Sequence, residues 1–423
     1  MESGFMNRFK TFKLSKKKSG CINFFLPIVV LYLICLTSCG SDKSIQGFSK
    51  DDGFDPNDKG VVADTLITTL EIEETFSDTL VATGNAPLLL LGAFKNIETN
   101  ILLKFENIPD TVTITNATIS IRTRELLGDN RNKSSFMASI HAVREDWEEG
   151  KVTEDNFANS FDANAIASAE ILSVSGTALD SNVTRIETVR FSLNSEGVDL
   201  VKSWADTTLE NFGFLVNFDL DQSLFIKEFY SKDALTQPLP TLDLEILDGT
   251  EKDTLFIPVT ADAYLFSSLI EPPAGRLYVD NVFSRQTVVK FDLSGIDSLA
   301  TINRADLILT LDRDNSIIGV DPFILQMITL DTPFESPESV ELGTISVDPL
   351  VIPLITRDMT TVTIPIRSII QLWVNNRIDN NGFLIRSATP GLDVARVAFR
   401  STTMDSAASA RLQIDFTTSP KIP

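Results

Sequence analysis

The sequence predicts an all-β protein made of two tandem, jelly-roll-like β-sandwich domains. Three observations lead to this fold class. Thr, Ser, Val, Ile, Leu and Phe recur throughout the 423 residues while long Ala/Glu/Lys/Leu-rich stretches are missing, and this mix favours strands over helices. Short segments alternate polar and apolar residues with period two between Asn, Asp, Gly and Pro, which is typical of half-buried strands. A set of sequence blocks occurs twice in the same order, which indicates an internal repeat.

Residues 1–38 have the organisation of a secretory signal peptide. Six Lys or Arg residues precede an apolar run from Ile22 to Leu36, and Leu36-Thr37-Ser38-Cys39 follows. This quartet resembles the lipobox of bacterial lipoproteins, in which the peptide is cut before the cysteine and the thiol carries a diacylglycerol. The resemblance implies a lipid on Cys39 that anchors the protein to the outer membrane, facing the cell exterior. The alternative is an ordinary membrane anchor, but the run is short for a span.

The segment 39–63 is polar and predicts a flexible tether with a reach of about 25 Å. Once residues 1–38 are removed, Cys39 is the only thiol, so the protein folds without disulfides and needs large hydrophobic cores. The whole chain has a net charge of −22. The first 38 residues hold six bases and one acid, so the remainder has 30 bases and 57 acids, a net charge of −27. Such a surface repels nucleic acid and suits a soluble secreted protein.

The repeat defines the domains. Trp204 and Trp373 are each followed nine residues later by Gly-Phe-Leu, beginning at Gly213 and Gly382. The segment 101–105 likewise matches 287–291, and each copy ends in an alternating Leu-rich segment. We therefore expect a first domain over 64–247, a linker over 248–255 and a second domain over 256–417 that folds on its own. The first domain has about seventeen extra residues, around 156–181.

Alternation with period two locates several strands, and one short helix is expected in each copy. The strand segments are 113–115, 118–122, 242–246, 305–311 and 411–416. Leu200, Val201 and Trp204 have the spacing of one helix face, as do Ile369, Ile370 and Trp373. Because both tryptophans hold the same place in the repeat, they suit core anchors better than ligand platforms.

The order of the repeated blocks resembles the DNRLRE family, whose β-sandwich domains are also classed as family 96 carbohydrate-binding modules on secreted bacterial and archaeal proteins. The resemblance covers both domains and implies a non-catalytic glycan-binding role. Many members carry Trp-x-Glu…Val-Thr-Trp in the middle. Here Glu154 stands where the second Trp is expected, and the second domain lacks both. The matching blocks are Asp78 and Asp262, Lys104-Phe105 and Lys290-Phe291, Ala117 and Ala305, Trp204 and Trp373, Ser231 and Ser401, and Leu242 and Leu412.

The residues offer little for catalysis. The chain has a single histidine, His141, and lacks Gly-x-Ser-x-Gly, a Walker loop, a dinucleotide fingerprint and His-Glu-x-x-His. We therefore expect no enzyme, no catalytic residue, no cofactor and no metal site. Among the candidate ligand-binding residues, Trp147 and Glu149 lie in an acidic segment where an indole can stack on a sugar and a carboxylate can take its hydroxyls. The alternative is a tryptophan that caps the edge of the sandwich.

Arginine marks the second domain. Residues 64–247 hold 13 bases and 30 acids, whereas 256–417 hold 12 bases and 19 acids, and eleven of those bases are Arg. Arg386 lies just after the Gly-Phe-Leu block and Arg400 lies within the neighbouring Phe-x-Ser block. Together they predict a site for an acidic polysaccharide, because guanidinium groups bind carboxylates through two parallel hydrogen bonds. The alternative is pairing with local acids such as Asp379, Asp393 and Asp405.

Two functional classes follow from these features. The first is a surface lipoprotein that binds extracellular polysaccharide and holds it for glycan-degrading enzymes or a transporter. The second is a structural or adhesion lipoprotein whose sandwiches mediate protein or cell-envelope contacts. A hydrolase or lyase comes third, because 57 acids make carboxylate pairs unavoidable and therefore uninformative.

Overall fold

The structure of the protein, a computed structural model, describes residues 62–77, 80–128, 135–173, 187–219, 225–235, 238–249, 251–268, 271–403 and 410–418. Residues 62–423 group as one compact unit. The predicted signal peptide, Cys39 and the tether lie outside the described residues. The described chain consists of antiparallel sheets with a few short helices, so the all-β prediction is confirmed.

The first sandwich surrounds a hydrophobic core drawn from residues 89–259. Its strands pair in the order β11-β10-β4-β9-β2-β3-β8-β5-β6, with β12 beside β3 and β7 beside β4. The helices are α2 (Glu154–Phe157) and α3 (Ser195–Ala205). The strands are β2 (Leu88–Phe94), β3 (Ile97–Lys104), β4 (Thr113–Gly128), β5 (Ser135–Ala142), β6 (Ala167–Leu172), β7 (Thr188–Ser192), β8 (Phe214–Phe218), β9 (Phe225–Tyr230), β10 (Thr241–Asp248), β11 (Glu251–Pro258) and β12 (Ala261–Ser268).

The second sandwich surrounds a core drawn from residues 277–416. One sheet has the order β17-β16-β19-β14-β1-β21-β15-β18, and β13 pairs with β20. Its helix is α4 (Arg367–Val374), with 3-10 turns at η2 (Pro337–Ser339) and η3 (Pro349–Val351). The strands are β1 (Val62–Ser77), β13 (Arg276–Asp280), β14 (Arg285–Phe291), β15 (Thr301–Thr310), β16 (Leu325–Leu330), β17 (Leu342–Ser346), β18 (Thr361–Pro365), β19 (Phe383–Ser387), β20 (Arg396–Arg400) and β21 (Arg411–Thr418).

The repeated tryptophans have the same surroundings in both sandwiches. Trp204 on α3 packs on Phe214 with ring centroids 4.8 Å apart, and Trp373 on α4 packs on Phe383 at 4.7 Å. Both indoles are buried, as expected for core anchors. The indole of each helix thus reaches the phenylalanine that opens the following strand and closes one end of its core.

The glycine before that phenylalanine is also explained by the structure. Gly213 and Gly382 have φ angles of +84° and +93°, a conformation that is strained for other residues. A Cβ at Gly213 would lie 2.2 Å from the carbonyl oxygen of Leu103, and one at Gly382 would lie 2.6 Å from that of Val289. Each glycine therefore lets the chain pass close against the neighbouring strand.

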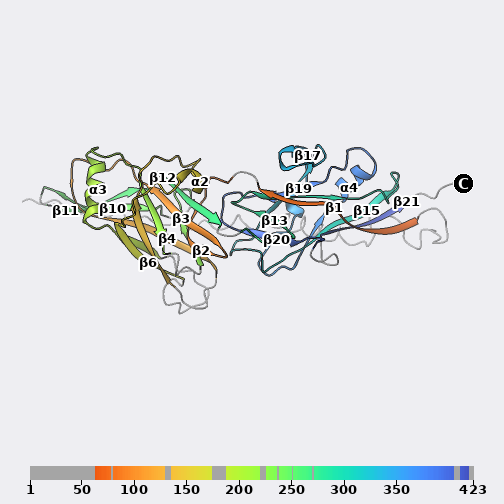
Figure 1. The fold of residues 1–423 in the computed structure, drawn as a ribbon, viewed down its shortest axis with the longest axis horizontal. Helices are drawn as coiled ribbons and strands as arrows, with labels where there is room; N and C mark the ends of the chain where they lie inside the picture. Colours follow the sequence, from red (N-terminus) through yellow and green to blue (C-terminus); the bar gives the residue numbers. More distant parts are fainter. Residues whose placement is uncertain are drawn as a thin grey trace, which may run out of the picture. The chain divides into compact units, whose positions relative to one another are not determined.

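The opening strand expected for each domain pairs with strands of the other domain (Figure 1). Strand β1, which precedes the first sandwich in the sequence, pairs with β21 and β14 of the second. Strand β12, expected to open the second domain, pairs with β3 of the first. The strand pairings thus cross the boundaries predicted at 247 and 256. The cause is local, because β11 follows β10 closely in the sequence and pairs directly with it, with Asp248 opposite Glu251.

A third hydrophobic cluster joins the two sandwiches. Leu90, Ile226 and Phe266 of the first pack with Phe283 and Ile317 of the second. The rings of Phe266 and Phe283 meet edge to face with centroids 5.1 Å apart. The sandwiches are therefore connected by buried apolar contacts as well as by the crossing strands.

Candidate functional site

The first candidate, Trp147, lies against the edge of the first sandwich. Its side chain is 9% exposed and packs with Leu102, Val143 and Leu215. The indole N–H donates to the carbonyl oxygen of Phe212 over 2.8 Å. Of the two alternatives left by the sequence, this burial fits the tryptophan that caps the sandwich edge. The rim of the ring borders a small hollow of about 150 Å³.

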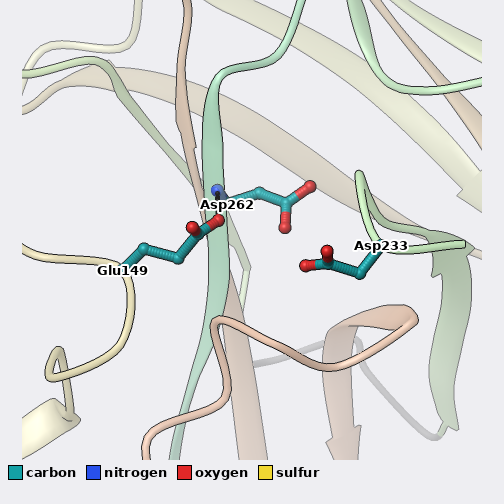
Figure 2. A group of neighbouring side chains, drawn as sticks. All are labelled: Glu149, Asp233 and Asp262. Carbon is teal, nitrogen blue, oxygen red and sulfur yellow. Dashed lines mark hydrogen bonds between the residues drawn. The ribbon is translucent and has the colours of Figure 1, made fainter.

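The second candidate, Glu149, belongs to a cluster of three carboxylates with Asp233 and Asp262 (Figure 2). One carboxylate oxygen from each residue lies within 4.8 Å of the others. Glu149 accepts the backbone N–H of Asp262 at 2.9 Å and the ammonium of Lys232 at 2.8 Å. Lys232 also lies 3.5 Å from Asp233. These carboxylates are the described groups best placed to hold a cation, and the lysine ammonium supplies positive charge among them.

Asp262 is the buried member of this cluster. Its side chain is 1% exposed, Oδ2 accepts the backbone N–H of Lys232 at 2.7 Å, and Oδ1 has no hydrogen-bond partner among the described residues. Burial raises the pKa of this carboxyl to about 7, and the carboxylate of Glu149 adds to the rise. Loss of water outweighs the hydrogen bond and the lysine charge, both of which lower the pKa.

The repeat shows what Asp262 does in the fold. Its Cα pairs with Leu103, and in the second sandwich the matching residue Val289 pairs with Glu73. Glu73 accepts the backbone N–H of Thr402 at 2.9 Å, just as Asp262 accepts that of Lys232. A carboxylate on the opening strand therefore fixes the loop that follows β9 or β20. The sequence blocks matched Asp262 with Asp78, but the strand register matches it with Glu73.

Arg386 and Arg400 lie on strands of different sheets. Arg386 on β19 donates to the side chain of Gln326 on β16 at 2.9 Å, whereas Arg400 on β20 pairs across to Arg276 on β13. Their neighbours Ile385 and Phe399 face the shared core. Both arginines therefore point away from that core because side chains alternate along a strand. The structure does not bring the two into one site.

A different group of basic residues does converge. A hollow of about 440 Å³ lies where the turn after β2 meets two loops of the second sandwich. Phe94 and Lys95 line it from the first sandwich, and Arg313 and Arg357 line it from the second, with Met359 beside them. Phe94 and Met359 are half-buried, whereas the three basic residues are exposed.

Hydrogen bonds hold this group in place. Lys95, at a φ of +49°, donates its ammonium to the carbonyl oxygens of Asp314 and Ser316 at 2.9 and 2.8 Å. Arg357 donates to the carbonyl oxygen of Gly319 at 3.0 Å. The guanidinium of Arg313 lies 3.9 Å from the exposed carboxylate of Asp358. The lining thus combines three cations, one carboxylate at Asp314 and an aromatic ring.

Sequence reasoning missed the hollow because its members come from three separate segments. The arginine enrichment of the second domain was the one available signal, but it did not distinguish Arg313 and Arg357 from the others. The single histidine, His141, belongs to the packed part of the first sandwich. It is buried on β5, where its ring nitrogens lie 2.8 Å from the Ser139 hydroxyl and 2.8 Å from the carbonyl oxygen of Asp162.

No protein-family model matches this sequence, and a search of curated proteins returns no match. Within the residues that the structure describes, no helix is both long and apolar enough to span a bilayer.

Proposed function

We propose that this chain is a non-catalytic, lipid-anchored surface protein that binds an acidic polysaccharide in the hollow between its two sandwiches. The observation that supports the proposal is the convergence of Lys95, Arg313 and Arg357 around Phe94 in a protein with a net charge of −22. The three cations make this hollow locally basic although the chain as a whole is acidic. A locally basic hollow suits a ligand that carries carboxylates or sulfates.

The chemistry of the lining fits a uronic-acid polymer. Guanidinium groups bind carboxylates through paired, charge-assisted hydrogen bonds. The ring of Phe94 and the thioether of Met359 offer apolar surface for the C–H groups of a sugar ring. The resemblance to the DNRLRE family points to glycan binding independently of this hollow.

Affinity electrophoresis tests the proposal. The chain from Gly40 onward contains every described residue, and we expect polygalacturonate in the gel to retard it more than a neutral glucan does. The double variant Arg313→Ala and Arg357→Ala should bind at least about tenfold more weakly, since a hydrogen bond to a charged group contributes about 1.5–3 kcal/mol. Binding should also weaken as salt rises.

A matched control separates local chemistry from net charge. Arg377 is an exposed arginine outside the hollow, so Arg377→Ala should leave retardation unchanged. A second double variant, Arg386→Ala and Arg400→Ala, tests the pair singled out by the sequence. Retardation that depends on this second pair would move the ligand away from the hollow. Uniform mobility of the parent chain on every glycan would favour the structural or adhesion role.

A further inference from the structure

The second sandwich is completed by a strand from a distant part of the chain. Residues 62–69 of β1 pair with β21, from Val62 opposite Thr418 to Thr69 opposite Arg411. Residues 70–77 pair with β14, ending at Ser77 opposite Arg285. Strand β1 therefore occupies a slot between β21 and β14, defined here as the closing slot.

The first sandwich has an equivalent slot that is filled locally. Strand β11 follows β10 through a short turn and pairs with it over its whole length, and β12 pairs with β3. The equivalence extends to single residues, because Asp262 on β12 and Glu73 on β1 both accept a backbone N–H from the matching loop. The same architectural position is thus filled by a neighbouring hairpin in one sandwich and by the first described strand in the other.

The two closing strands differ in how they are held. Five side chains of β12, Asp262 to Phe266, are buried. None of the twelve described side chains of β1 is fully buried, and Ile67 is 60% exposed. Strand β1 is held by its backbone ladder, by polar contacts such as that of Thr65 with Asp415 at 2.8 Å, and by partly buried apolar side chains, of which Phe76 stacks on Phe334 with ring centroids 5.9 Å apart. Because none of its described side chains is fully buried, less apolar burial is disrupted when β1 leaves the slot than when β12 leaves its own.

We propose that the closing slot accepts β1 from a second copy of this chain, so that two copies exchange their first strands reciprocally. An identical strand remakes the same ladder and the same polar contacts, which is why exchange of an element between copies has a low energetic cost. The connection from β1 to β2, of which residues 80–87 are described, is the segment that changes path. The proposal is independent of glycan binding.

Cysteine pairing across the slot tests the exchange. The chain from Gly40 onward has no native cysteine. One copy carries Thr65→Cys, and a differently tagged copy carries Asp415→Cys. The two are unfolded, mixed at high concentration, refolded and oxidised. Because residues 65 and 415 are cross-strand partners, strand exchange should give a covalent heterodimer on a non-reducing gel.

Two controls make the result decisive. Thr254 is exposed on β11, outside the closing slot, so Thr65→Cys mixed with Thr254→Cys reports random collisions. We expect at least tenfold more heterodimer from the 65/415 mixture. A single chain with both Thr65→Cys and Asp415→Cys should form the 65–415 disulfide within one copy when it is monomeric and between copies when the strands are exchanged. If the disulfide forms only within one copy while the 65/415 mixture gives no more heterodimer than the 65/254 mixture, the proposal is wrong. Absence of both forms of the disulfide would overturn it as well, because β1 would then not occupy the slot.

Discussion

At the residue scale, the protonation of the buried Asp262 carboxyl makes the free energy of unfolding depend on pH. Its folded-state pKa of about 7 lies above the ordinary value of 3.8, so the folded protein retains a proton that the unfolded chain has released between these values. This contribution to stability is fully present at low pH and is lost as pH rises towards about 7. The neighbouring carboxylate of Glu149 adds to the rise, whereas Lys232 opposes it.

Asp262→Asn should remove this pH dependence. The amide oxygen can still accept the N–H of Lys232, and no charge has to be buried at high pH. The unfolding free energy of the variant should therefore rise relative to the parent between pH 4 and pH 8, by at most about 4 kcal/mol at about 1.4 kcal/mol per pKa unit. Urea unfolding of both proteins at several pH values measures the difference. The exposed Asp358→Asn serves as control, and the prediction fails if both variants follow the same pH profile.

The repeated tryptophans allow a second test. Trp373 is buried on Phe383, and its indole N–H has no described hydrogen-bond partner. Trp373→Ala should lower the unfolding free energy by about 3–5 kcal/mol because it leaves a cavity. Trp373→Phe should cost less, since it keeps a ring and removes an unpaired donor. Denaturant titration measures both, and a loss within error for the alanine variant would mean that the ring is exposed.

At the scale of elements, the position of β1 depends on pairing rather than on chain order. Strand β1 begins at Val62 opposite Thr418, where β21 ends, just as β11 begins at Glu251 opposite Asp248, where β10 ends. Only two residues of the sequence separate β10 from β11. The end of β21 is thus placed where a similar turn would join it to β1.

A circular permutant follows from this geometry. The permutant starts at Leu80, runs to Thr418, passes through Gly-Thr and continues from Val62 to Ser77. It should unfold at nearly the denaturant midpoint of the parent, because every strand pair is kept. The Gly-Thr turn from β21 to β1 replaces the connection from β1 to β2 as the link that holds β1 in the chain. Circular dichroism during denaturant titration checks the outcome. The matched control ends at Thr418 without residues 62–77, and it should be less stable because the closing slot is empty.

Independent folding of residues 256–417 stays a prediction, and the strand pairings show what it requires. This segment contains β12 but lacks β1, so it can complete the second sandwich only by placing 261–268 beside β14. Of the buried side chains of that strand, Ala263 and Leu265 pack against the first sandwich, whereas Tyr264 and Phe266 belong to the cluster that joins both sandwiches. The segment alone must find new contacts for Ala263 and Leu265.

At the scale of the whole molecule, the expected lipid lies at the N-terminal side of the closing strand. Cys39 lies outside the described residues, and the chain from it leads to Val62, where β1 begins. Cys39→Ala should leave the precursor uncut or release the protein from membranes, because the thioether to the lipid cannot form. Membrane fractionation with detection of the bound lipid measures this. Cys35→Ala should behave like the parent, and a Cys39→Ala protein that still fractionates with lipid would contradict the anchor.

The net charge acts at this scale too. An excess of acids repels anionic polymers at close range, and at physiological salt this repulsion is largely screened beyond the Debye length of about 8 Å. Only a locally basic surface can retain an acidic ligand against that field. Among the described residues, the hollow of Lys95, Arg313 and Arg357 has this character.

The all-β fold class and the packing around Trp204 and Trp373 followed from the sequence alone. These features depend on local patterns, namely period-two alternation, a helix face ending in Trp, and a glycine where the chain crosses its neighbour closely. Each pattern is contained in about a dozen consecutive residues and recurs in both copies.

The tertiary structure alone decided which strand closes which sandwich and which charges meet. The backbone of a strand such as 62–77 can hydrogen-bond to any free sheet edge. Its sequence therefore predicts a strand but not the strand with which it pairs. The short connection after β10 lets β11 and β12 complete the first sandwich. The second sandwich is completed by β1. The same dependence on distant pairing separates Arg386 from Arg400, buries Trp147 against Phe212, and brings Lys95 to Arg313 and Arg357 across more than two hundred residues.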